Sequence, residues 1–561
     1  MSYAAACSAA YGLFGCSIKR IHLNMALGSV DLISSGSFYV TQSQNYAIEL
    51  KKIDKRFGAV HANKAIDLKV PAGTIHGIIG ENGAGKSTLM SIIYGFYTPN
   101  SGEMFVDGKP YNPNNSQEAI AAGIGMVHQH FMLVDTFTVL ENVVLGAESG
   151  WKLEDSLKAA RKKLHQIEKD YGLDVPLDKL VGDLPVGLQQ RVEILKALYR
   201  DAKLLILDEP TGVLTPQEAD HLFAILDKLR SQGTTVIIIT HKLREVLAIT
   251  DNISVMRQGQ MVADVKTSDT NREELAELMV GRKVRLKVDK SEAKPAKELL
   301  KVNKLGYVDH SGVKRVKDIS FSVRAGELVG IAGVSGNGQS EILSLLSGIL
   351  KPTSGSFELN GHTISVDKPA DPQQVRAMGV GHIPEDRHKQ GLINKFEAQE
   401  AYILGYHNLP KYNKGLLQDK AAISKICQES MDKWDVRPND IHLKTANFSG
   451  GNQQKLVIAR EMEENPDVLL IGQPTRGVDI GAIEYIHQQI IASRDAGKAV
   501  LLVSVELDEI LSLADRILVV FDGAIVGELQ AHQADEKTLG LMMANIIPDH
   551  IKESIAQGET A

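Results

Sequence analysis

The sequence predicts an α/β protein built from two copies of one domain, each with a mainly parallel β-sheet. Three observations predict it. The second half of the chain repeats the motifs of the first half, short apolar runs alternate with helical patterns, and a glycine-rich loop joins one such run to a helix. A length of 561 residues, with 43% hydrophobic and 23% charged residues, fits two ordinary globular domains.

Composition excludes several classes of protein. The formal net charge of −7 argues against a nucleic-acid or anionic-lipid surface. The three cysteines (Cys7, Cys16 and Cys427) are too few and too scattered for a disulfide framework or a zinc site, so a reducing compartment is expected. No run of about 18 apolar residues predicts a membrane-spanning helix, so we expect membrane association only through partners.

Residues 1–45 are expected to form an N-terminal extension without stable structure. The segment Ser2–Ile18 is uncharged and rich in small residues, which leaves a signal peptide as an alternative. Its lack of preceding basic residues and its weak apolar core disfavour that interpretation. Met25 is an alternative start.

The repeat is visible in ordered pairs of matching motifs. The sequence LLILDEPTG matches VLLIGQPTR, LPVGLQQR matches FSGGNQQK, and VIIITHKLREV matches VLLVSVELDEI, each 264 residues further on. Earlier in the chain, GENGAGKST matches GVSGNGQSE at an offset of 253 residues. The period is far longer than in solenoid repeats, so each copy is a domain, and the second has roughly 11 residues inserted.

The organisation that we expect has five parts. They are the extension 1–45, a first domain 46–281, a linker 282–298, a second domain 299–548 and a tail 549–561. The linker is charged and lacks apolar periodicity. In the first domain, Ile75–Ile79 and Leu204–Leu207 are predicted to be buried parallel strands, and the charged stretch Ala147–Tyr171 a helical subdomain.

The segment Gly80–Ser87 matches the pattern G-x-x-x-x-G-K-[ST] after an apolar strand and before a helical pattern. Its glycines let backbone N–H groups close around phosphate oxygens at a helix N-terminus. Lys86 is predicted to reach the β- and γ-phosphates, Ser87 to ligate Mg²⁺ and Thr88 to contact the α-phosphate. The predicted nucleotide ligands here are Gly80, Glu81, Asn82, Gly83, Ala84, Gly85, Lys86, Ser87 and Thr88.

An acidic pair ends the second buried strand. Asp208 is predicted to position Mg²⁺ and Glu209 to activate water, because the pair leaves the strand downstream of the phosphate loop. Acidic residues often merely mark strand ends, and the phosphate loop decides between the two interpretations.

Three further residues are predicted to face the nucleotide. Gln129 lies on a candidate loop where it would contact both the metal and the attacking water. His241 follows the apolar run VIIIT and would hydrogen-bond the γ-phosphate, the alternative being a structural histidine. Phe57 would stack on adenine, the alternative being a core aromatic.

The motifs around Lys86, Gln129, Leu184–Arg191, Asp208–Glu209 and His241 follow the order of Walker A, Q-loop, signature, Walker B and H-loop. The chain therefore resembles the nucleotide-binding domain of an ABC transporter, twice over. The resemblance implies P-loop NTPase domains with a mainly parallel sheet, a small antiparallel β part and a helical subdomain. It also implies ATP and Mg²⁺ as cofactors, bound at composite sites between the Walker motifs of one domain and the signature of the other.

On this resemblance, site one is complete. It combines the first domain's motifs with the second domain's signature, and the catalytic residues are Glu209, His241, Gln129 and Lys86. The metal contacts are Ser87, Gln129 and Asp208, and the second domain supplies Ser449, Gly450, Gly451 and Gln453. The SGG segment opens a helix whose N–H groups can face the γ-phosphate.

Site two is degenerate. The second domain has Gln339 at the lysine position, Gly472-Gln473 at the acidic pair, Val505 at the histidine and Glu385 at the Q-loop, and its partner signature has Pro185 and Val186. Proline lacks an N–H and valine adds bulk, while glutamine cannot accept a proton from water. We expect site two to bind nucleotide weakly or statically and not to hydrolyse it.

The motifs PEDR (Pro384–Arg387) and QPTRGVD (Gln473–Asp479) resemble the ATPase subunits of bacterial simple-sugar importers, and other segments resemble the nucleoside-importer branch. We therefore expect nucleosides rather than ribose or galactose as the solute. The resemblance implies two integral-membrane permeases and an extracytoplasmic solute-binding protein as partners, and a peripheral location on the cytoplasmic face of the inner membrane. The permeases' coupling helices would dock after Gln129 and after Glu385.

A soluble tandem ATPase acting on ribosomes or DNA is the rival from another class. Such proteins usually keep both sets of Walker motifs and carry a long basic inter-domain arm, whereas here the linker is short, the net charge is negative and one site is dismantled. A purely regulatory or binding module is disfavoured because Glu209 and the Ser449 signature are intact.

Overall fold

The computed structural model describes residues 24–25, 28–29, 45–58, 60–128, 131–147, 153–212, 214, 216–284, 288–334, 336–548 and 551. Most of the predicted N-terminal extension and C-terminal tail lies outside these residues. Within the described part of the chain, no helix combines the length and the apolar character needed to cross a membrane.

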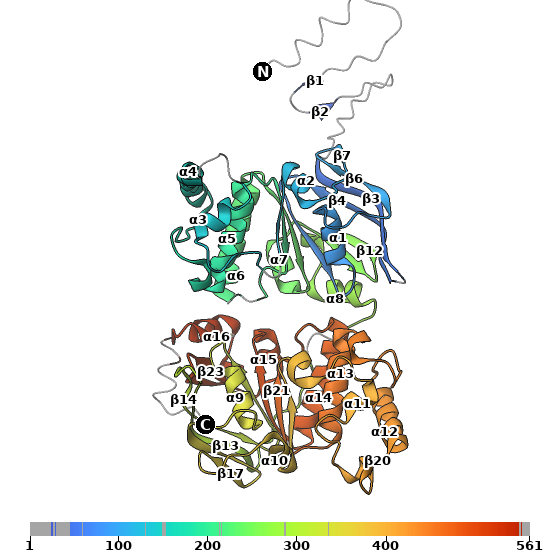
Figure 1. Ribbon diagram of the computed structural model, residues 1–561, viewed down its shortest axis with the longest axis vertical. Helices are drawn as coiled ribbons and strands as arrows, with labels where there is room; N and C mark the ends of the chain where they lie inside the picture. Colours follow the sequence, from blue (N-terminus) through green and yellow to red (C-terminus); the bar gives the residue numbers. More distant parts are fainter. Residues whose placement is uncertain are drawn as a thin grey trace, which may run out of the picture.

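Two similar α/β units lie one above the other (Figure 1). Domain 1 runs from β3 (Tyr46–Phe57) to α8 (Arg272–Val280), and domain 2 from β13 (Glu298–Val308) to α16 (Glu536–Met543). Each has a six-stranded and a four-stranded sheet with matching strand orders, so the predicted duplication of one α/β fold is confirmed.

The large sheet of domain 1 has the order β12-β11-β5-β10-β9-β8. Its strands are parallel except β12, which pairs antiparallel with β11. The smaller sheet, β4-β3-β6-β7, is antiparallel. Besides β3, the strands of these two sheets are β4 (Val60–Pro71), β5 (Ile75–Gly80), β6 (Ser101–Val106), β7 (Lys109–Tyr111), β8 (Ile124–Val127), β9 (Leu204–Asp208), β10 (Thr235–Thr240), β11 (Asn252–Arg257) and β12 (Gln260–Lys266).

The predicted parallel strands are confirmed as β5 and β9, each paired in parallel with β10. All six residues of β5 are buried, as expected for a strand covered on both faces. The predicted helical stretch 147–171 contains α4 (Leu153–Tyr171). The other helices are α1 (Lys86–Ile93), α2 (Ser116–Ala121), α3 (Val139–Val144), α5 (Val186–Tyr199), α6 (Pro216–Ser231), α7 (Leu243–Ile249), and the short η1 (Val181–Asp183) and η2 (Thr267–Asp269).

Domain 2 repeats this plan, with a large sheet ordered β18-β21-β22-β15-β23-β24 and a small sheet ordered β14-β13-β16-β17. Its strands are β14 (Lys314–Arg324), β15 (Glu327–Ala332), β16 (Ser354–Leu359), β17 (His362–Ser365), β18 (Val380–Ile383), β21 (Val468–Gly472), β22 (Ala499–Ser504), β23 (Arg516–Phe521) and β24 (Ala524–Gln530). A hairpin of β19 (Asn413–Lys414) and β20 (Leu417–Gln418) extends from the helical part.

The helices of domain 2 form a group beside the large sheet, with others that lie along the sheet (Figure 1). They are α9 (Gln339–Leu346), α10 (Pro372–Ala377), α11 (Ala398–Tyr402), α12 (Lys420–Lys433), α13 (Gly450–Glu463), α14 (Ile480–Asp495) and α15 (Leu507–Leu513), with the π-helical turn η3 (Arg387–Gly391) and the short η4 (Pro410–Tyr412), η5 (Thr445–Asn447) and η6 (Ala531–Gln533).

The two domains face each other head to tail. Helix α1, which follows the phosphate loop of domain 1, lies on the same side of the molecule as α13 and α14 of domain 2 (Figure 1). Helix α14 contacts α8, and Ile480 at its start packs against an apolar cluster of domain 1. The phosphate loop of domain 1 therefore lies toward the signature helix of domain 2.

Candidate functional site

The loop Gly80–Gly85, called phosphate loop 1, connects β5 to α1. Gly83 and Gly85 have φ angles of 81° and 99°, in the left-handed region that glycine adopts readily. A Cβ on Gly85 would lie 2.3 Å from the carbonyl oxygen of Ala62, so no larger residue fits there. The sequence thus folds into a tight cradle of backbone N–H groups at a helix N-terminus, which suits an anion.

Lys86 arches over this loop. Its side chain is 6% exposed, and Nζ donates hydrogen bonds to the carbonyls of Gly80 (2.7 Å) and Glu81 (3.0 Å). Burial lowers the pKa of Lys86, while the charges of Glu209 and Asp208 raise it. The ammonium group therefore lies between the loop and the acidic pair at the end of β9.

Asp208 lies opposite the first turn of α1, where its carboxylate is near the Ser87 hydroxyl. Burial raises the pKa of Asp208 to about 6, and the neighbouring charge of Glu209 adds to this effect. Lys86 and Ser87 act in the opposite direction. A carboxylate and a hydroxyl thus converge beside the phosphate loop.

Glu209 points instead toward His241, which follows β10. The distance between His241 Nδ1 and Glu209 Oε1 is 2.9 Å, and this hydrogen bond lowers the pKa of Glu209 against the effect of burial. Glu209 also has a φ of 47°, a strained conformation for a residue with a side chain. Glu209 is therefore held ionised in a fixed orientation.

Two other predicted ligands lie at the margin of the site. Phe57 ends β3 and is 41% exposed, so it is no core aromatic; its ring centroid is 5.1 Å from that of Tyr97. Thr88 is half-buried in the first turn of α1. Gln129 lies outside the described residues, so its predicted contacts stay predictions.

The segment Ser449–Gly451, called the signature loop, begins α13. Ser449 is the N-cap residue, and its Oγ accepts a hydrogen bond from Asn452 Nδ2 (2.8 Å). Gln453 is only 5% exposed, and its Nε2 donates to the Thr445 carbonyl (2.9 Å). The structure thus places the Gln453 amide behind the loop, inside domain 2, rather than on the exposed side predicted for a nucleotide ligand.

A direct contact joins phosphate loop 1 to domain 2. The Glu81 carboxylate lies near the backbone N–H of Gly481. Burial and the charge of Asp479 raise the pKa of Glu81, whereas this N–H lowers it. A Cβ on Gly451 would lie 2.9 Å from the Asp479 carboxylate, so Asp479 also borders the signature loop. The two halves of predicted site one therefore meet around Asp479.

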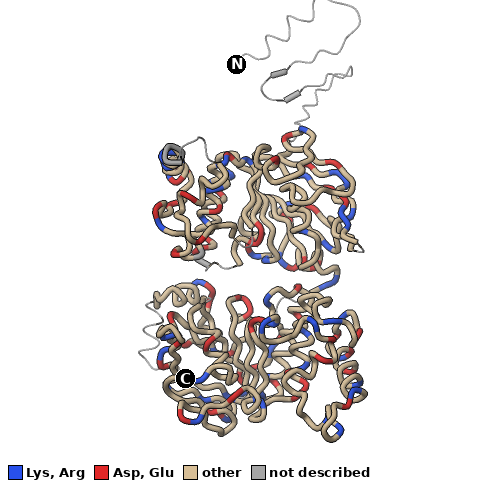
Figure 2. The backbone as a smooth tube through the Cα atoms, in the orientation of Figure 1, with Lys and Arg blue, Asp and Glu red and all other residues tan. Residues whose placement is uncertain are grey.

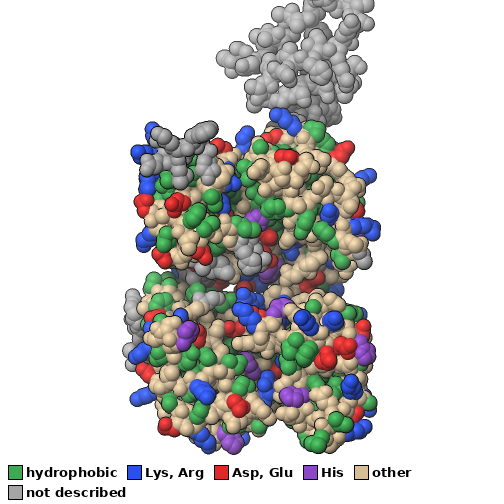
Figure 3. Space-filling model, in the orientation of Figure 1, with side chains coloured by type: hydrophobic (Ala, Val, Ile, Leu, Met, Phe, Trp, Pro, Cys, Tyr) green, Lys and Arg blue, Asp and Glu red, His purple; other side chains and the backbone are tan. Residues whose placement is uncertain are grey.

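Ion pairs extend this contact across the boundary between the domains. Arg282 pairs with Glu484 (2.9 Å), and Arg272 with Asp508 (2.8 Å). Figure 2 shows charged residues of both signs along the facing sides of the two domains. In the space-filling view of Figure 3, charged and histidine side chains lie at the same boundary. The contact thus combines these ion pairs with the apolar packing of Ile480.

The corresponding loop of domain 2, Gly333–Gly338, keeps the backbone but loses the cation. Gly336 and Gly338 have φ angles of 91° and 97°, close to those of phosphate loop 1. Gln339 replaces the lysine and is 3% exposed. Its amide nitrogen faces the Val334 carbonyl (3.2 Å) and its oxygen the Gly333 N–H (3.0 Å), so an uncharged side chain holds this loop together.

Glu385 occupies the space that an acidic residue would need at position 472. A Cβ on Gly472 would lie 2.5 Å from Glu385 Cγ. Ser340 Oγ donates to Glu385 Oε2 (2.5 Å), in the position where Ser87 lies near Asp208 in domain 1. The carboxylate–serine pair thus survives in domain 2, with the carboxylate coming from a different strand.

The groups that would act on water are absent from the described part of domain 2. Gln473 adopts the same strained φ (45°) as Glu209, and its Oε1 accepts a hydrogen bond from the Val505 N–H (3.3 Å). Pro185 is the N-cap residue of α5 and makes no side-chain cap. Site two is therefore folded, but glutamine and valine stand at the positions of Glu209 and His241, as the sequence predicts.

The sequence analysis did not predict that Glu385 replaces the carboxylate lost at position 472, or that Asp479 borders both loops of site one. It also did not predict that Arg387 donates hydrogen bonds to Gln453 and to the Arg476 carbonyl. The signal available for Glu385 was the loss of a carboxylate at position 472 together with its gain at the Q-loop position. Asp479 and Arg387 lie in motifs that the sequence analysis singled out only as marks of a resemblance. Their contacts depend on segments that are far apart in the chain.

The sequence pattern of the ABC transporter family matches residues 63–212 and again residues 316–476. The chain therefore belongs to the ABC transporter family, as the resemblance predicted. The two matches cover one copy each of the phosphate loop position and the strand that carries the acidic pair. This confirms the predicted pair of ATP-binding P-loop domains.

Curated relatives extend over most of the chain. The nucleoside import ATP-binding protein NupA of Lactococcus lactis subsp. cremoris is 45% identical over 88% of this chain and 97% of its own length. The guanosine import ATP-binding protein NupO of Bacillus subtilis is 46% identical, covering 89% and 97%. A ribose import ATP-binding protein of Lactococcus lactis subsp. lactis is 38% identical, covering 88% and 98%.

A solved structure shares the tandem fold. The archaeal ribosome recycling factor aABCE1, in its complex with the stalk protein aP1, matches 91% of this chain and 98% of its own with a TM-score of 0.58. At 20% sequence identity this likeness concerns the fold alone.

Proposed function

We propose that this chain hydrolyses ATP at site one and thereby powers the import of nucleosides. The observation that carries the ATPase proposal is the Glu209–His241 pair (2.9 Å) beside the Lys86-spanned phosphate loop, in contact with domain 2. The relatives that carry the solute proposal are the nucleoside and guanosine import ATP-binding proteins at 45% and 46% identity.

The residues present fit a magnesium nucleotide. In phosphate loop 1 the left-handed conformations of Gly83 and Gly85 let backbone N–H groups converge at the start of α1, as a phosphate group requires. The Ser87 hydroxyl and the Asp208 carboxylate are hard oxygen donors of the kind that Mg²⁺ prefers. They would hold the ion, whose charge would help to neutralise the phosphates.

Glu209 is the proposed general base. Glu209 is ionised at neutral pH, its pKa being lowered by the hydrogen bond from His241, and its carboxylate can therefore accept a proton from the attacking water. His241 holds the carboxylate in orientation through Nδ1. Lys86, the loop N–H groups and the Ser449–Gly451 loop stabilise the charge that develops on the transferred phosphoryl group.

Site two is proposed to hold nucleotide without cleaving it. Its loop keeps the left-handed glycines, and Glu385 with Ser340 restores a carboxylate–hydroxyl pair. Gln473 stands where Glu209 stands in domain 1, and an amide orients water without accepting its proton. Binding and hydrolysis are therefore separated between the two sites.

Two permeases and an extracytoplasmic solute-binding protein are the proposed partners, and the chain is proposed to lie against the permeases at the cytoplasmic face of the membrane. ATP binding would draw the domains together around the Glu81–Gly481 contact, and release of the products would let them separate. This movement is the step that the permeases would convert into transport.

Uptake of labelled nucleosides and of labelled ribose tests the proposal. Host cells carrying the intact gene, a deletion and Glu209→Gln are compared. We expect the deletion and the point variant to lose nucleoside uptake and to keep ribose uptake, because Glu209→Gln preserves the fold and removes the base.

Loss of ribose uptake alone would keep the transporter and move its solute to the simple sugars, in line with the ribose relative at 38% identity. Unchanged uptake of both, with a defect in translation or DNA repair, would contradict the import proposal and favour a soluble tandem ATPase.

A further inference from the structure

The PEDR segment of domain 2 leaves β18 and enters the turn η3. The Asp386 carboxylate accepts hydrogen bonds from the N–H groups of His388 (3.0 Å) and Lys389 (3.2 Å), which caps the turn. Arg387 is the first residue of this capped turn. The cap made by Asp386 therefore fixes the backbone of Arg387.

The Arg387 side chain reaches under the signature loop. Its Nε donates to Gln453 Oε1 (3.2 Å) on α13, and its Nη1 donates to the Arg476 carbonyl (2.8 Å) in the segment that leads to Asp479. A Cβ placed on Gly450 would lie 2.7 Å from Arg387 Nη2. One guanidinium thus touches both backbone segments that border phosphate loop 1.

Arg387 has no counterpart in domain 1. Because β8 and β18 end at equivalent positions, Gln129 corresponds to Glu385 and Phe131 corresponds to Arg387. A phenylalanine cannot donate hydrogen bonds. The arginine therefore occurs in the domain whose signature loop faces the intact ATP site, and the domain with the altered signature lacks it.

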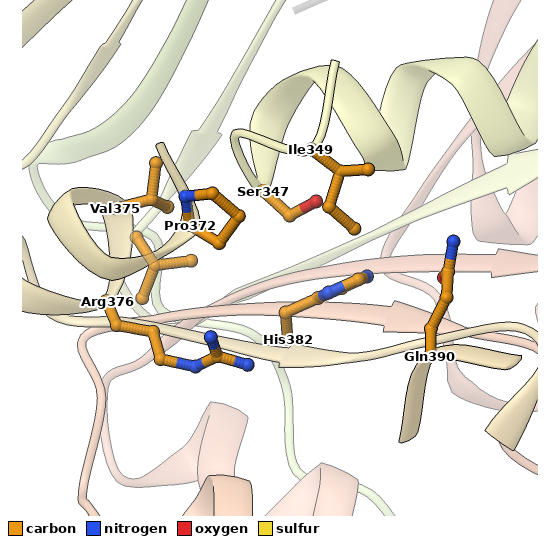
Figure 4. A pocket seen from close by; sticks show the side chains of 8 residues that line it. Ser347, Ile349, Pro372, Val375, Arg376, His382 and Gln390 are labelled. Carbon is orange, nitrogen blue, oxygen red and sulfur yellow. The ribbon is translucent and has the colours of Figure 1, made fainter. Parts of the chain in front are cut away.

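The turn η3 also borders a pocket of domain 2. Gln390, in η3, borders a cavity of about 250 Å³ together with Ser347, Pro372, Arg376 and His382 (Figure 4). Gln390 follows Glu385, in the segment where a permease is expected to dock, and the other lining residues come from earlier parts of domain 2. The turn is thus shared by this cavity and, through Arg387, by the signature loop.

We propose that Arg387 is a positioning residue that holds the signature loop of domain 2 in the conformation that completes ATP site one. It acts through Gln453 and the Arg476 carbonyl and does not touch the nucleotide itself. The inference rests on the proposed function of site one. Because the signature loop is expected to meet only the γ-phosphate, losing Arg387 weakens the binding of ATP and leaves the binding of ADP unchanged.

Nucleotide affinities of the full chain test this inference. Arg387→Gln is introduced into the Glu209→Gln background, and dissociation constants for ATP and ADP are measured by competition with a fluorescent ATP analogue. Binding that Lys86→Ala removes is assigned to site one. We expect ATP affinity to fall about tenfold, the lower end of what a charge-assisted hydrogen bond contributes, with ADP affinity unchanged.

Two variants separate positioning from general damage. Arg387→Lys keeps a donor and is expected to recover part of the ATP affinity. Lys389→Gln, in the same turn with an 83% exposed side chain, is expected to match the Glu209→Gln reference. The inference is overturned if Arg387→Gln binds ATP like the reference, or if ATP and ADP affinities fall together with the melting temperature. A reference chain that binds no ATP would instead refute the proposed function.

Discussion

Two adjacent carboxylates, Asp208 and Glu209, have pKa values shifted in opposite directions by their surroundings. Burial raises the pKa of Asp208 to about 6, whereas the hydrogen bond from His241 lowers that of Glu209. Asp208 faces Ser87, and Glu209 faces the histidine that follows the next strand. The environment of each residue thus suits it to a different role, one toward a metal ion and one toward water.

Glu209→Gln is predicted to lower the rate of ATP hydrolysis about 100- to 1000-fold, because the amide cannot accept the proton of the attacking water. Phosphate release by the purified chain measures the rate, and equilibrium binding shows that ATP still binds. Glu273→Gln, an exposed change in the first turn of α8, is the matched control and is expected to behave like the wild type. Hydrolysis at the wild-type rate in Glu209→Gln would refute the assignment.

The sequence was sufficient to predict the residues of site one that lie in motifs, since Lys86, Asp208 and His241 each follow a recognisable strand or loop pattern. It did not predict that Glu385 replaces the carboxylate lost at Gly472. That substitution depends on β18 and β21 being parallel neighbours, with Ile383 opposite Ile471. Pairing of strands about 90 residues apart leaves no local pattern.

At the scale of secondary structure, the strand before the phosphate loop carries a buried histidine. His76 Nε2 lies 2.7 Å from Ser254 Oγ on the neighbouring β11, and burial lowers the pKa of His76 to about 4. Below the usual pKa of about 6.5, His76 becomes protonated in the unfolded chain, whereas in the folded chain it stays neutral until the pH approaches 4. The contribution of His76 to stability is therefore complete above that pH and is lost as the pH falls toward 4.

When the pH is lowered from 7 to 5, the protonation of His76 in the unfolded chain is predicted to reduce the free energy of unfolding by about 2 kcal/mol. Denaturant unfolding of the wild type and of His76→Gln at both pH values measures it. The variant is expected to lose less stability than the wild type over this interval. An equal loss in both chains would show that His76 does not contribute to the pH dependence.

The phosphate loop gives a second prediction at this scale. Gly85→Ala is expected to weaken ATP binding more than tenfold, because its Cβ would meet the Ala62 carbonyl at 2.3 Å and the fit of the cradle would be lost. Gly108→Ala is the matched control, with a similar positive φ of 75° and nothing within 4 Å of its Cβ. Calorimetric ATP binding compares them, and equal affinities in the two variants would contradict the cradle described for Gly85.

Two strands of the large sheet of domain 1, β5 and β9, could be predicted from apolar runs, since buried parallel strands have a clear signature. The small antiparallel sheets followed only from the resemblance to a family. Neither the hairpin β19–β20 nor the turn η3 was predicted, because both are short and lack periodicity. Capping of η3 by Asp386 fixes its geometry, and a cap of this kind is hard to distinguish from an ordinary acidic surface residue in sequence alone.

In the whole molecule, two domains of similar fold carry different parts of the ATP site. Their sheets have matching strand orders and their phosphate loops similar glycine conformations, but the acidic pair and its histidine belong to domain 1 and the intact signature to domain 2. The approach of Glu81 to Gly481 and the ion pairs Arg282–Glu484 and Arg272–Asp508 join these two halves. The sequence predicted which parts share a site, but only the placement of the domains reveals these contacts.

The central claim is that each chain cleaves ATP at one site only. Its most direct test is a single-turnover count: the chain is loaded with γ-labelled ATP without Mg²⁺, then mixed with Mg²⁺ and excess unlabelled ATP, and the labelled phosphate released per chain is measured. We predict that at most one phosphate is released per chain by the wild type and none by Glu209→Gln. Release of two phosphates per chain, or of one by Glu209→Gln, would contradict it.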